Sequence, residues 1–265
     1  MNLYHIISEL EKVDEDVHER LNYISRRSVF NTIGKKVSAL AIPTLVATSL
    51  NKAYAATPVA MDVLNFALTL EYLDSEYFTK GINTANLIPG SDRPVFTQVA
   101  KHENEHVAFI KATLGNKAIP KPTFDFTGKG LFPDVFTNYK TFAMVGHAFE
   151  DHGVRAYKGQ AGNLMAAEDK PILEAALRIH SVEARHTAGI RYLINIRNLV
   201  EETEPWITLN EGTPAGIYTG EDNTMQGGVE TSGLAGRSKE RASEAFDEPL
   251  SREAVLANAS RFIAT

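Results

Sequence analysis

The sequence predicts an all-α protein whose core is an antiparallel four-helix bundle with one long crossover connection. Apolar side chains recur at helical spacing in four long stretches. Two of these stretches contain Glu-x-x-His, at Glu103–His106 and at Glu183–His186, which places both side chains of each motif on one helix face. A segment rich in Pro and Gly, residues 115–132, separates the four stretches into two pairs.

The first pair of helices has clear start and stop signals. Thr57 is a suitable N-cap and Pro58 suits the first turn, while Gly81 and residues 83–90 end the first helix. The second helix is expected over residues 94–114. Its connection to the first is short, so the two should form an antiparallel hairpin.

The second pair repeats this arrangement. The third helix is expected over residues 133–160, with Gly162 and Asn163 ending it, and the fourth begins near Pro171. Residues 115–132 then form the long crossover that lets the second and third helices lie parallel.

A glutamate in each hairpin completes a repeated pattern of metal-ligating residues. Glu71 and Glu150 precede the motif residues Glu103 and Glu183 by 32 and 33 residues, and within antiparallel hairpins each pair falls at the same height. Glu71 lies in an apolar stripe, where a carboxylate needs a cation, a donor or a proton. Carboxylate beside imidazole suits iron, manganese or zinc. The candidate ligands are Glu71, Glu103, His106, Glu150, Glu183 and His186.

These residues also carry a resemblance to a known family. With the stretches 64–73, 102–110 and 148–151, they make the chain resemble the ferritin-like superfamily, in particular its branch of desiccation-related and stress proteins. The resemblance covers about residues 57–200 and a piece near 245–264. It implies two iron ions, or alternatively manganese. We expect Glu71, Glu103 and His106 to hold one metal and Glu150, Glu183 and His186 to hold the other, with two of the four glutamates bridging.

The resemblance is compatible with several different reactions. Ferroxidase, peroxidase and catalase-like chemistry all fit, with dioxygen or peroxide as the partner molecule. The alternative is a non-catalytic stress or desiccation protein, in which the metal is structural or absent. Both the catalytic and the non-catalytic protein could form a homo- or hetero-oligomer.

Four further side chains are candidates for groups that contact the ligands. They are His147, Tyr157, Tyr72 and His180. His147 is either an extra ligand or, as we favour, a hydrogen-bonded core histidine. The tyrosines are either redox-active or ordinary core aromatics, and His180 is ambiguous in the same way as His147. His102 and Glu105 fall off the inner face of their helix and are expected to be solvated or to contact a ligand from outside.

Residues 1–55 have the parts of an export signal. Arg26 and Arg27 precede an apolar run, residues 37–50, and an Ala-x-Ala site ends at Ala55. The run is shorter than the ~20 residues of a membrane span. The twin arginine resembles that of a twin-arginine signal, so we expect cleavage after Ala55 and a periplasmic or otherwise exported protein. An uncleaved N-terminal anchor or a buried helix is the alternative.

The bundle is expected to occupy residues 56–200, and residues 201–265 form an irregular C-terminal extension. Trp206 is its expected anchor, residues 227–237 look flexible, and a short helix over residues 252–263 should dock on the bundle or on a partner. The net charge of −6 argues against nucleic-acid binding. The chain has no cysteine, so any metal must be held by histidine and carboxylates.

Overall fold

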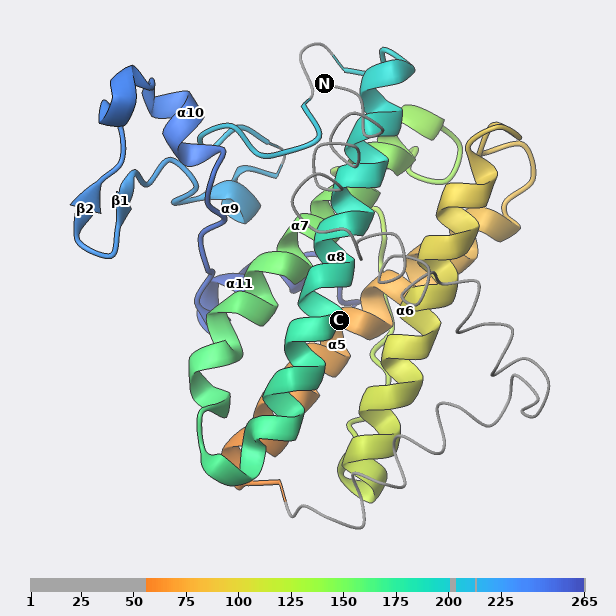
Figure 1. Cartoon of the computed structure of the whole chain (residues 1–265). Coiled ribbons are helices and arrows are strands. Elements are labelled where there is room, and N and C mark those ends of the chain that lie inside the picture. The colour runs from red at the N-terminus through yellow and green to blue at the C-terminus, as the bar shows by residue number, and fades with distance from the viewer. Residues whose placement is uncertain (1–55, 201–203, 213, 265) are drawn as a thin grey trace, which may run out of the picture. The chain divides into compact units, whose positions relative to one another are not determined.

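The computed structural model describes residues 56–200, 204–212 and 214–264. The expected export signal, residues 1–55, lies outside the described residues. Four long helices confirm the all-α prediction (Figure 1). They are α5 (Pro58–Asn83), α6 (Arg93–Leu114), α7 (Tyr139–Ala161) and α8 (Lys170–Ile196). In the described part of the chain, no helix is long and apolar enough to cross a membrane.

The helices pack as two hairpins, α5 with α6 and α7 with α8. The first hairpin begins at the expected cap, because the Thr57 hydroxyl accepts a hydrogen bond from the Ala60 N–H (3.1 Å). Thr57 also donates through its hydroxyl to the carboxylate of Asp169, just before α8, at 2.6 Å. The cap therefore joins the start of the first hairpin to the second.

The expected start of the third helix at Pro133 was wrong by six residues. Helix α7 begins only after Asn138, whose extended backbone and side-chain hydrogen bond to the Lys140 N–H make it the N-cap. Asp134 forms a separate turn before it, accepting from the Asn138 N–H at 2.9 Å. The crossover also contains a short 3-10 helix, η1 (Gly115–Lys117). It is therefore longer than the Pro- and Gly-rich segment alone.

Two apolar clusters fill the two ends of the bundle. One is aromatic and is centred on Tyr77, whose ring stacks on Phe142 (centroids 5.0 Å apart) and whose hydroxyl donates to the Phe142 carbonyl. The other is mainly aliphatic and includes Leu64, Leu68 and Ile110. Along α6 and α8 the predicted metal ligands lie between the residues of these two clusters, and on α5 and α7 Glu71 and Glu150 lie next to cluster residues.

The C-terminal extension contains more regular structure than the sequence predicted. It holds α9 (Ala215–Tyr218), the antiparallel pair β1 (Met225–Gln226) and β2 (Val229–Glu230), η4 (Leu234–Gly236), α10 (Lys239–Ser243) and α11 (Arg252–Ala259). The segment expected to be flexible thus includes β2 and η4. Helix α11 ends four residues before Ile263, which instead bridges to Phe124 in the crossover.

The extension docks on the bundle through α11 and through Tyr218. Val255 and Ala259 of α11 pack with Phe66 and Ala156 of the bundle. Trp206 was a wrong choice of anchor, because 43% of its surface is exposed, whereas Tyr218 is fully buried. One indole in a polar segment is a weak signal of burial, since large aromatics also occur at the surface.

Buried polar contacts hold the extension in place. Arg155 of α7 is fully buried, and its Nε lies 2.6 Å from the Glu221 carboxylate. Its guanidinium also donates to the carbonyls of Thr219 and Glu248, each at 2.8 Å. The extension therefore covers the outer face of α7, which explains why this helix carries buried charged residues on the side away from the bundle core.

Replacing Arg155 with Met should lower the free energy of unfolding by about 3–5 kcal/mol, because Glu221 would remain buried without its partner. Urea unfolding of the two proteins measures the difference. Arg178→Met is the matched control, since Arg178 pairs with Glu174 on the exposed face of α8 and should cost at most ~0.5 kcal/mol. Equal losses in the two variants would contradict this account of the docking.

Candidate metal centre

The six predicted ligands converge at one level of the bundle from all four helices. Glu71 comes from α5, Glu103 and His106 from α6, Glu150 from α7, and Glu183 and His186 from α8. The four glutamates are at most 2% exposed. Each lies on the inward stripe of an amphipathic helix, so the apolar periodicity that builds the bundle also brings the carboxylates together.

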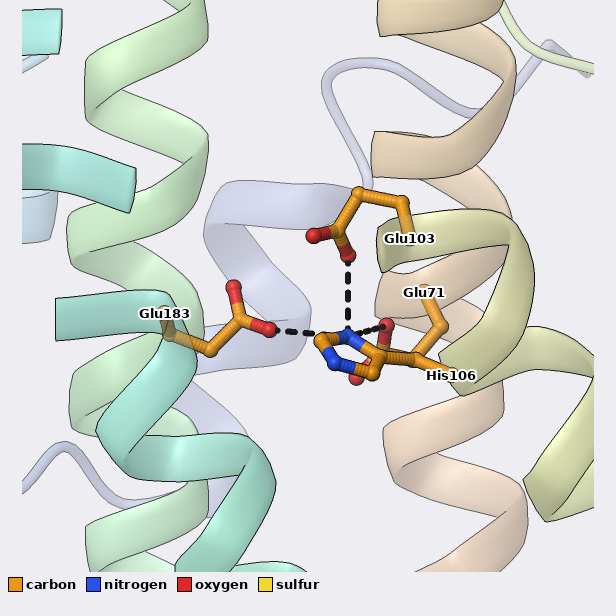
Figure 2. A group of neighbouring side chains, drawn as sticks. All are labelled: Glu71, Glu103, His106 and Glu183. Carbon is orange, nitrogen blue, oxygen red and sulfur yellow. Dashed lines mark hydrogen bonds and ion pairs between the residues drawn. The ribbon is translucent and has the colours of Figure 1, made fainter. Parts of the chain in front are cut away.

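His106 is at the middle of the first group of ligands (Figure 2). Its Nδ1 lies 3.2 Å from Glu71 Oε2, 3.3 Å from Glu103 Oε2 and 3.1 Å from Glu183 Oε1. One ligand atom from each of these four residues lies within 4.8 Å of all the others. That spacing is compatible with all four atoms surrounding one metal ion.

His186 has the same place in the second group, with Glu103, Glu150 and Glu183. Its Nδ1 lies 3.0 Å from Glu103 Oε1 and 3.1 Å from Glu150 Oε2. Glu103 and Glu183 thus belong to both groups. The sequence predicted that two of the four glutamates are shared, and the geometry indicates which two.

The cluster has too few hydrogen-bond donors for its carboxylates. One imidazole nitrogen carries at most one hydrogen, yet the Nδ1 of His106 faces three carboxylates. Within the described part of the chain, Glu103 Oε1, Glu150 Oε1 and both oxygens of Glu183 accept no hydrogen bond, although two of these oxygens lie close to a histidine nitrogen. Four carboxylates with neutral imidazoles match the charge of two divalent cations. The residues therefore fit a pair of metal ions.

Protons must supply this missing charge when no metal is bound. Burial raises the pKa of Glu150 well above its usual value, and the nearby Glu183 and Glu103 raise it further. Burial alone would lower the pKa of His106, but the carboxylates of Glu71, Glu103 and Glu183 outweigh it, so that this pKa is raised. Metal binding therefore has to displace protons from the site.

A glycine of α7 leaves room for one of the shared carboxylates. A Cβ atom on Gly153 would lie 3.2 Å from Glu183 Oε2, which is a tighter contact than most side chains accept. A side chain there would require the Glu183 carboxylate to shift by a few tenths of an ångström. The backbone of α7 thus helps to shape the site without supplying a ligand at this position.

Two side chains outside the ligand set contact the ligands directly. Tyr157 donates its hydroxyl hydrogen to Glu71 Oε1. His102 Nδ1 lies 2.8 Å from His186 Nε2, and the two rings stack with their centroids 5.1 Å apart. A partner at the far nitrogen of a ligating histidine fixes its ring orientation and tautomer.

The other three candidates lie away from the ligand groups. The Tyr72 hydroxyl donates to the Ile119 carbonyl in the crossover (3.3 Å). His147 lies 3.4 Å from the Tyr218 hydroxyl, and burial lowers its pKa to about 4, as for a neutral core histidine. His180 is half-buried and belongs to neither group, and burial lowers its pKa as well.

Asp74 is a fifth acidic residue close to the ligands, and the sequence did not predict it. It is 4% exposed, and its Oδ1 accepts no hydrogen bond from any residue that the structure describes. Burial raises its pKa well above the usual value, and the nearby carboxylates of Glu103, Glu183 and Glu71 raise it further. The signal was present, because Asp74 follows Glu71 by three residues, at the spacing of the Glu-x-x-His motifs.

The stability of the metal-free protein should fall as the pH rises from 7 to 9. The folded state raises the pKa of His106 above its unfolded value of 6.5, so this contribution is complete below that value and is lost as the pH rises towards the folded pKa. One retained proton corresponds to a slope of at most about 1.4 kcal/mol per pH unit. Urea unfolding in the presence of a chelator measures the slope. In His106→Gln the slope should be shallower, and an unchanged slope would contradict the assignment.

The chain matches one family model, described as ferritin-like domain, over residues 60–196. The matched region includes the four long helices almost completely and all six predicted ligands. No curated protein matches the chain. The match extends over half of the chain and agrees with the four-helix bundle and its buried carboxylate and histidine groups. The chain therefore belongs to the ferritin-like domain family.

Proposed function

We propose that this protein holds a dinuclear iron centre and uses it for redox chemistry with peroxide or dioxygen, including the oxidation of Fe(II). The observation that carries the proposal is the sharing of Glu103 and Glu183 between two buried ligand groups. A single structural metal needs neither two histidines at two positions nor six inward ligands. Two adjacent metal ions would supply the ability to exchange two electrons with dioxygen or peroxide.

Each ligand has a distinct part in this proposal. Glu71 and His106 would hold one ion, Glu150 and His186 the other, and Glu103 and Glu183 would contact both. Carboxylates can change between terminal and bridging contacts as the charge of the ions changes. Tyr157 is hydrogen-bonded to Glu71 and would limit its movement, and His102 would do the same for His186. The apolar clusters at both ends of the bundle keep water away from these groups.

Iron loading under anaerobic conditions, followed by exposure to peroxide or dioxygen, tests the proposal. The wild-type chain should bind two iron ions, one for each group, and absorbance should report their rapid oxidation. Glu183→Ala should impair binding of both ions because Glu183 is shared, whereas Glu150→Ala should impair one. Glu105→Ala is the matched control, since Glu105 is exposed on the same helix as Glu103 and should change neither quantity.

The outcomes of this experiment separate the alternatives. Bound iron that reacts with neither oxidant would favour the stress-protein function with a structural metal, and no bound iron would reject the dinuclear centre. Manganese that consumes peroxide catalytically would identify a catalase-like protein instead. If Glu183→Ala and Glu105→Ala bind the same amount of iron, Glu183 is not a ligand.

We also propose that the protein is exported by the twin-arginine route. Arg26 and Arg27 support this proposal, as does the Ala-x-Ala site that ends two residues before the N-cap Thr57. Cleavage after Ala55 would leave the contacts of Thr57 with Asp169 intact. The mass of the mature protein should correspond to a chain that begins at Ala56. Full-length protein in the exported fraction would contradict cleavage at this site.

A further inference from the structure

A small cavity lies between α5, α7 and α8, next to the metal ligands but outside both groups. Its walls include Leu64 and Ala67 of α5, Ala156 and Tyr157 of α7, Leu164, and Ala176 of α8. Its volume is about 20 Å³, counted for the centres of water-sized molecules. The space that an occupant itself fills is larger than this and exceeds the ~10–15 Å³ that one water molecule occupies, so the cavity has room for a small molecule such as a diatomic gas.

The cavity offers few hydrogen bonds to an occupant. Its walls are almost entirely aliphatic and aromatic carbon, and their main polar groups are the Tyr157 hydroxyl and the Gln160 amide. The hydroxyl donates to Glu71, and the Gln160 carbonyl oxygen accepts from the Asn163 side chain at 3.0 Å. Water needs two to four polar partners to occupy a buried site stably, whereas a dry apolar cavity can bind an apolar gas such as xenon. These walls therefore favour an apolar molecule over water or peroxide.

Tyr157 connects the cavity with the metal ligands. Its side chain forms part of the cavity wall, while its hydroxyl is bonded to Glu71 of the first ligand group. Ala67 lies one helical turn before Glu71 on α5, so the wall and the ligand also share a helix face. Tyr157 and Ala176 are only partly buried, so part of the cavity wall reaches the surface of the bundle.

We propose that this cavity binds dioxygen and is its point of entry to the metal centre. The inference rests on the proposed function and narrows it, because dioxygen is apolar and diatomic, whereas hydrogen peroxide needs hydrogen bonds, of which these walls supply few. The cavity would concentrate dioxygen beside Tyr157 and Glu71. Peroxide would have to reach the metal ions by another path.

Xenon binding to the metal-free full-length chain tests the cavity itself. The methyl NMR signals of Ala67 and Ala176 should shift in a saturable way as the xenon pressure rises. Ala176→Leu should abolish the shift at Ala67, because the larger side chain fills the cavity. Ala175→Leu is the matched control on the same helix, since Ala175 does not line the cavity, and it should keep the shift.

Ala67→Val fills the cavity from the opposite wall and keeps the test decisive if Ala176→Leu does not fold. The absence of a saturable shift in the wild-type protein would overturn the proposal. An unchanged xenon-induced shift in a correctly folded cavity-filling variant, measured at whichever of Ala67 and Ala176 was not replaced, would also overturn it.

Iron-loaded protein tests the route. Ala176→Leu should slow the oxidation of bound Fe(II) by dioxygen several-fold and leave oxidation by peroxide unchanged, while Ala175→Leu should affect neither. Equal slowing with both oxidants, or no slowing with dioxygen, would overturn the entry route. If the wild-type chain binds no iron, the dinuclear function and the entry route fail together, while the xenon result still decides whether the cavity takes an apolar gas.

Discussion

The burial of four carboxylates within a few ångströms of one another is the constraint on which the rest of this structure depends. Each charge removed from water costs several kcal/mol unless a proton or a cation neutralises it. Neither histidine can donate to all the oxygens that face it, so the bundle has to hold a cluster that is unfavourable without bound charge. The burial of the two apolar clusters stabilises the folded bundle and offsets this cost. The clusters lie towards the two ends of the same helices that carry the ligands.

The C-terminal extension supports the same layer from outside. Asp151 and Thr187 directly follow the ligands Glu150 and His186. The Thr187 hydroxyl donates a hydrogen bond to the Asp151 carboxylate at 2.6 Å. Asp151 also accepts hydrogen bonds from Arg191 (2.6 Å) and from Tyr218 of the extension (2.7 Å). Burial raises the pKa of Asp151, but Arg191 outweighs this effect and keeps the carboxylate charged. The extension is thus hydrogen-bonded to Asp151, next to Glu150 in α7, and through Asp151 it is linked to Thr187, next to His186 in α8.

Much of the bundle could be predicted from the sequence because its signals are local. Caps and prolines located the starts of α5, α6 and α8, and the spacing of Glu71, Glu103, Glu150 and Glu183 indicated one layer of ligands. The start of α7 was missed because the turn at Asp134 resembles a helix start. The contacts of Arg155 and Tyr218 join residues more than 60 positions apart, and no local pattern predicts such pairs. Asp74 was overlooked because a single acidic residue on a helix is usually solvated.

Anomalous X-ray scattering from crystals grown with Fe(II) or Mn(II) tests the central claim most directly. The account predicts two strong peaks inside the bundle, one within contact distance of Glu71 and His106 and the other of Glu150 and His186, with Glu103 and Glu183 touching both. A single peak would reduce the site to a mononuclear one. Peaks only at the protein surface, with the six side chains still protonated and hydrogen-bonded to one another, would contradict a metal centre inside the bundle.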